Sequence, residues 1–80
     1  MEKCLYIATI TYLDLQEMEA RTFVLGASKK HDDAMKFLLE NIQGKLKLGY
    51  RKTDFEIHTW GWTFENQYVK ILADTHLLYL

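Results

Sequence analysis

The chain has 80 residues, of which 49% are apolar, 26% are charged and 14% are aromatic. This length favours one folded domain over 1–80, and the composition argues against a disordered protein. The single cysteine, Cys4, excludes an internal disulfide. A domain this small buries a modest share of its surface, so we expect a second copy or a partner protein to contribute to its stability.

The N-terminal residues do not have the pattern of a secretory signal. Thr9 and Thr11 interrupt the apolar run that follows Met1–Lys3, and no small-residue cleavage site comes after it. No segment approaches the roughly 18 apolar residues that a membrane span requires. We therefore expect a cytoplasmic protein that does not insert into a membrane.

Alternating residues predict two strands at the start of the chain. In the first, residues 3–13, both faces are partly apolar, and residues 18–25 form the second after a short link that predicts a hairpin. One face of the first strand carries Leu5, Ile7, Thr9, Thr11 and Leu13, and the other carries Cys4, Tyr6, Ala8, Ile10 and Tyr12.

A helix is predicted over residues 29–43. Ser28 is a suitable N-cap, and Asp32 and Asp33 suit the first turn of a helix. Either Gly44 or Gly49 is expected to end it. The apolar residues that recur at helical spacing are Ala34, Met35, Leu38, Leu39, Ile42 and Leu46.

Two further strands are predicted, over 54–64 and 67–73, with a turn at Glu65-Asn66-Gln67 because asparagine tolerates a left-handed backbone. The order β-β-α-β-β predicts an α+β domain whose four-stranded antiparallel sheet carries the helix on one face. The sequence does not decide between two expectations for the apolar tail, residues 76–80: it pairs as a further strand, or it is exchanged with a neighbouring copy. The helix is expected to pack on Leu5, Ile7, Val24, Phe55, Ile57, Val69 and Ile71.

Aromatic residues gather on what we predict to be the uncovered face of the sheet. A large exposed apolar patch usually marks an interaction site, and tryptophan and tyrosine dominate interface energies. We expect this face to bind a partner protein or a second copy in a homodimer. The alternatives are that the tail or the helix covers it, or that it forms a small-ligand pocket. Its residues are Tyr6, Tyr12, Trp60, Trp62 and Phe64.

Acidic residues are concentrated near the two ends of the chain. Residues 1–28 hold four acidic against two basic side chains, and residues 53–80 hold four against one. If they line strand edges, as Glu56 would, they either meet a basic partner surface or protect the edges from aggregation. Asp54, Glu56 and His58 alternate, so a strand would align them for metal or acid–base chemistry, although a solvated edge is the simpler interpretation. We predict no metal and no cofactor.

The middle of the chain is basic, with seven basic against three acidic residues over 29–52. Such a cluster can bind phosphates, and Tyr50 is placed to stack on a base. The nucleic-acid alternative would use Lys29, Lys30, Lys45, Lys47, Arg51 and Lys52. Lysines on the solvated face of a helix are the competing explanation.

No motif of a known enzyme class occurs, and only four glycines are present, none at a phosphate-binding spacing. We therefore predict a non-enzymatic protein-binding module that acts as a small inhibitor or adaptor. Inhibitors of host machinery made by phages or other mobile elements are one class of such proteins. The alternative is a nucleic-acid-binding module.

Overall fold

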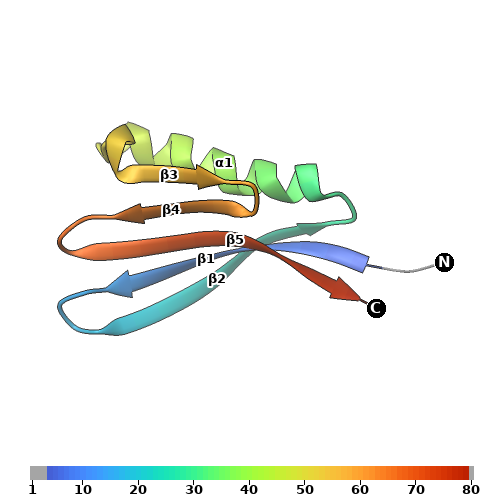
Figure 1. Ribbon diagram of the computed structural model, residues 1–80, viewed down its shortest axis with the longest axis horizontal. Helices are drawn as coiled ribbons and strands as arrows, with labels where there is room; N and C mark the ends of the chain where they lie inside the picture. The colour runs from blue at the N-terminus through green and yellow to red at the C-terminus, as the bar shows by residue number, and fades with distance from the viewer. Residues whose placement is uncertain (1–3, 80) are drawn as a thin grey trace.

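The computed structural model describes residues 4–79, so Lys3 of the first predicted strand and Leu80 of the tail lie outside the described residues. Five strands form one antiparallel sheet (Figure 1). A helix, which follows the second strand in the sequence, packs on one face of this sheet. The predicted α+β class is confirmed, but the sheet has five strands rather than four. The elements are β1 (Cys4–Asp14), β2 (Glu19–Ser28), α1 (His31–Lys47), the 3-10 turn η1 (Lys52–Asp54), β3 (Phe55–His58), β4 (Gly61–Glu65) and β5 (Val69–Tyr79).

The extra strand arises because the segment predicted as one strand over 54–64 is a hairpin. Thr59 and Trp60 form its turn, and His58 pairs with Gly61 to close it. Gly61 has a φ of +156°, and a Cβ there would collide with the carbonyl oxygen of Ala73 on β5. Glycine is therefore required where β4 begins beside β5. The strand pattern continues through this turn, which is why alternation alone did not reveal it.

The strands lie in the order β2-β1-β5-β4-β3, with β2 and β3 at opposite edges (Figure 1). The central strands β1 and β5 pair from Cys4 opposite Tyr79 to Asp14 opposite Val69. The described part of the apolar tail is thus the end of β5, which is paired along the start of β1.

The helix differs from its prediction at both ends. Its N-cap is Lys30, which makes no side-chain cap, whereas Ser28 ends β2. The Ser28 hydroxyl accepts a hydrogen bond from the Lys30 N–H and donates one to Asp33. Gly44 lies within α1, and the helix stops before Gly49, whose φ of +99° is the left-handed conformation typical of a helix C-terminus.

The core lies between α1 and the middle strands. Of the predicted partners of the helix, Phe55, Val69 and Ile71 lie on its side of the sheet, whereas Leu5 and Ile7 face away from it. Because both faces of β1 are partly apolar, the alternation did not decide which one the helix covers. The buried apolar residues are Ala8, Ile10, Ala34, Leu38, Ile42, Trp62, Phe64, Ile71 and Ala73.

Candidate interaction surfaces

The predicted aromatic face is the face that the helix covers. Trp62 is 0% exposed, Phe64 is almost fully buried, and the Trp62 indole N–H donates a 2.8 Å hydrogen bond to the Leu38 carbonyl of α1. The expectation that this face is open to a partner is therefore wrong, and the alternative of covering by the helix holds. The small side chains of Ala8 and Ala73 leave room there for the large rings.

The two predicted tyrosines are half-buried at the ends of this covered face. The Tyr6 ring packs edge-on against His31 at the start of α1, with their centroids 5.3 Å apart. The Tyr12 hydroxyl accepts a hydrogen bond of 2.7 Å from the Lys45 ammonium near the helix end. Both rings hold the helix to β1, which is a structural role.

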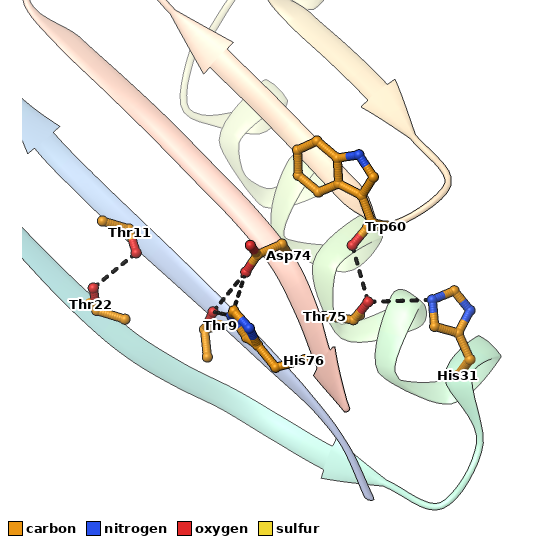
Figure 2. Close-up of polar contacts among 8 residues, drawn as sticks. All are labelled: Thr9, Thr11, Thr22, His31, Trp60, Asp74, Thr75 and His76. Atoms are coloured by element: carbon orange, nitrogen blue, oxygen red, sulfur yellow. Dashed lines mark hydrogen bonds and ion pairs between the residues drawn. The ribbon is translucent and has the colours of Figure 1, made fainter. Parts of the chain in front are cut away.

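Trp60 is the one member of the aromatic set with a substantially exposed side chain, at 40%. It lies in the β3–β4 turn, where its ring stacks on His58 with centroids 4.6 Å apart. Its carbonyl accepts hydrogen bonds from the N–H and hydroxyl of Thr75, and the Thr75 hydroxyl also contacts the His31 ring (Figure 2). The turn is thus fixed to β5 while the indole remains accessible.

The opposite face of the sheet is covered by no element of residues 4–79. Side-chain alternation and the strand register place on it the residues of β1 and β5 that point away from α1. Its apolar residues flank a polar centre, and we call the whole set the open face. It comprises Leu5, Ile7, Leu13, Leu72 and Leu78, together with Thr9, Thr11, Asp74 and His76 between them and Lys70 opposite Leu13.

The polar centre of the open face is a closed triangle of contacts (Figure 2). The His76 Nε2 lies 2.7 Å from Asp74 Oδ1 and 3.0 Å from the Thr9 hydroxyl, and that hydroxyl donates to Asp74 at 3.1 Å. One ring nitrogen meets both partners, whereas an acid–base relay through histidine uses the two nitrogens separately. The geometry therefore satisfies these groups mutually and does not activate the threonine hydroxyl.

The predicted line of Asp54, Glu56 and His58 is only partly formed. Asp54 belongs to η1, not to a strand, and accepts hydrogen bonds from Arg51. Glu56 and His58 share one side of β3, with 3.9 Å between Oε2 and Nε2, and His58 also contacts the Thr63 hydroxyl. Within residues 4–79, no group of three or more histidine, cysteine or acidic side chains is arranged to hold a metal ion.

The basic segment does not form one cluster. Lys29 and Lys30 precede α1, whereas Lys47 is its last residue and Lys52 lies beyond it. The 17 residues of the helix place these two pairs of lysines about 25 Å apart. Lys45 is only 8% exposed. Arg51 is engaged by Asp54, and the two line an open hollow of about 630 Å³ with Tyr50, Phe64 and Tyr68.

The β2 edge is a surface that the sequence interpretation missed. All six residues from Glu19 to Val24 are exposed, including Phe23 at 50% and Val24 at 69%, and Met18 in the preceding turn is also exposed. The outer side of β2 pairs with no strand among the described residues. The sequence signal that could have indicated this exposed edge is a strand segment with apolar residues and without proline or lysine.

Comparison of the chain with protein-family models, with curated proteins and with solved structures finds no match. Within residues 4–79, no helix has the length and apolar character that crossing a membrane requires.

Proposed function

We propose that the protein is a non-enzymatic protein-binding module, a small inhibitor or adaptor, whose open face docks on a partner protein. The observation that carries the proposal is that α1 covers one face of the sheet, while the other face presents branched apolar side chains to solvent. Leu72 and Leu78 are 38% and 45% exposed. Exposed apolar patches on small proteins commonly mark such interfaces.

The polar centre of the open face supports docking because its groups are already paired. Asp74, His76 and Thr9 hydrogen-bond with one another. Covering polar groups costs free energy mainly when they lose hydrogen bonds to water without replacement. A partner that carries apolar side chains on either side of a polar group would match this arrangement. It would bury the leucines at both ends and meet the triangle between them.

The arrangement of charge favours a protein partner over nucleic acid. Of the six residues that the nucleic-acid alternative needs, Lys45 is buried against Tyr12 and Arg51 is paired with Asp54. The remaining lysines are divided between the two ends of α1. Phosphate binding by a dispersed set of this kind would be weak and strongly salt-dependent.

The test compares three tagged proteins in lysate of the cells that encode the chain, with and without nuclease treatment. Leu72→Lys places a charge in the open face, and Leu48→Lys places the same charge at an exposed apolar residue after α1. We expect the wild type and Leu48→Lys to capture the same protein and Leu72→Lys to lose it. Calorimetry with that purified partner should then give a Kd at least about tenfold weaker for Leu72→Lys.

Circular dichroism of all three proteins checks that the fold is retained. Equal capture by all three, or by none of them, would remove the open face as the docking site. Capture that disappears on nuclease treatment would instead favour the nucleic-acid alternative.

A further inference from the structure

We propose that a second copy of this chain pairs with the first half of β2, Glu19–Val24, so that two sheets join edge to edge in a two-fold dimer. This interface is a strand edge, distinct from the open face, and it does not rest on the proposed function. It also differs from the homodimer expected from the sequence, which used the aromatic face that α1 in fact covers.

The edge is available for pairing. The exposed half of β2 lies at the outer edge of the sheet, opposite to β3 (Figure 1). An unpaired edge strand offers its backbone N–H and C=O groups to another chain, and natural proteins usually block this with lysine, proline or a bulge. The first half of β2 has neither lysine nor proline. The register shift opposite Ala8 and Thr9 comes only after Val24, which limits regular pairing to this half.

The register shows which backbone groups point outward. The Leu15 N–H donates to the Tyr68 carbonyl, so the odd-numbered residues of β1 bond to β5 and the even-numbered ones bond to β2. The residues of β2 opposite those even-numbered residues are Arg21 and Phe23. The N–H and C=O groups of Ala20, Thr22 and Val24 therefore face the empty side of β2.

These outward groups are self-complementary about Thr22. An antiparallel copy centred there places Thr22 opposite Thr22 and Ala20 opposite Val24 in each direction, which gives about six hydrogen bonds between the chains. The Thr22 hydroxyl already lies 2.9 Å from that of Thr11 (Figure 2), so a threonine ladder would continue across the two-fold axis. Cross-strand threonine pairs of this kind are favourable.

The side chains on the other side of β2 also fit a second copy. In the same register Arg21 lies opposite Phe23 of the other chain, twice by symmetry. Among residues 4–79, Arg21 makes no ion pair or side-chain hydrogen bond, and Phe23 is 50% exposed although its ring has an edge contact with Tyr12. A guanidinium over an aromatic ring is attractive. On the Thr22 side of β2, the small Ala20 leaves room for Val24 of the other chain. Because every contact is made twice by one surface, the fit points to a second copy.

The first experiment measures the molar mass against concentration by sedimentation for three proteins. Val24→Lys and Ile57→Lys place the same charge on edge strands β2 and β3, at residues that are 69% and 66% exposed. We expect a dimer for the wild type and for Ile57→Lys, and a dissociation constant raised at least about tenfold for Val24→Lys. A wild-type monomer at all concentrations would overturn the proposal, as would a dimer weakened by Ile57→Lys rather than Val24→Lys.

A second experiment tests the register, with Cys4 replaced by serine. Thr22→Cys brings two thiols together across the proposed axis, and mild oxidation should link the chains, whereas Met18→Cys in the preceding turn should remain unlinked. Equal linkage of the two variants, or linkage only of Met18→Cys, would contradict pairing centred on Thr22. Both experiments use purified protein without a partner, and Leu72 is intact in every variant, so their failure is distinguishable from failure of the proposed function.

Discussion

The Lys45 ammonium donates a 2.7 Å hydrogen bond to the Tyr12 hydroxyl and thereby ties the end of α1 to the hairpin end of β1. The same nitrogen lies 4.7 Å from the centroid of the Tyr12 ring and 5.3 Å from that of Tyr50. Among residues 4–79, no carboxylate pairs with Lys45. The two aromatic rings therefore stabilise the buried charge in place of a counter-ion.

We expect Tyr12→Phe to destabilise the fold by about 1–3 kcal/mol, because it removes the side-chain acceptor of a buried cation. Lys45→Met should cost less, since a residue of similar length replaces the charge and leaves no buried ammonium without an acceptor. Urea unfolding of both single variants and the double variant measures the coupling. Additive free-energy changes would show that the contact contributes no coupling energy.

Two glycines should respond in opposite directions to alanine. Gly61→Ala is expected to cost more than about 2 kcal/mol, because the new Cβ would collide with the Ala73 carbonyl and the positive φ is unfavourable. Gly44→Ala adds its methyl group where no atom outside its own helix turn lies within 4 Å, and it should stabilise the helix by about 0.5–1 kcal/mol. Thermal unfolding followed by circular dichroism compares the two; a Gly61→Ala protein as stable as the wild type would contradict the close approach of β4 and β5.

The two tryptophans should be spectroscopically distinct. With Trp60 changed to phenylalanine, the remaining buried Trp62 should emit at shorter wavelength and resist quenching by acrylamide. With Trp62 changed to phenylalanine, the remaining Trp60 should emit at longer wavelength, and the lost packing should cost about 2–4 kcal/mol. Similar spectra from the two variants, with both shown to be folded, would argue against burial of Trp62 beneath α1.

Asn66 fixes the β4–β5 turn through its side chain. Its Oδ1 accepts hydrogen bonds from the backbone N–H groups of Tyr68 and Val69 at 2.8 and 2.9 Å. Asn66→Ala should therefore cost about 1 kcal/mol, whereas Gln67→Ala, at an exposed neighbouring position, should be nearly neutral. Chemical denaturation measures both; equal stability of the two variants would show that the side-chain turn contributes nothing.

The turn also shows where a correct sequence prediction had a different physical reason. Glu65-Asn66-Gln67 was predicted as a turn because asparagine tolerates a left-handed backbone. Among the described non-glycine residues, positive φ occurs at Met18 and not at Asn66. The side-chain amide of Asn66 acts as an acceptor instead. Residue type located the turn, but hydrogen bonds to the Asn66 side chain, rather than a left-handed backbone, form it.

By itself, the sequence determined the local elements with strong periodicity: the first hairpin, the helix and the start of β5. Apolar spacing and β-branched residues specify these elements through contacts between near neighbours. The sequence could not decide whether the helix ends at Gly44 or at Gly49, because glycine is tolerated within a helix at a modest cost.

Only the tertiary structure decided which face of the sheet became the core. Both faces of β1 are partly apolar, so burial depended on how Trp62, Phe64 and Ile71 from distant segments fit around Ala8 and Ala73. That packing placed the predicted aromatic surface beneath α1, with Trp60 left at the turn. It also left the open face and the β2 edge exposed. The physical reason is that alternation specifies two faces of a strand, whereas volume complementarity between segments far apart in the chain selects the one that is buried.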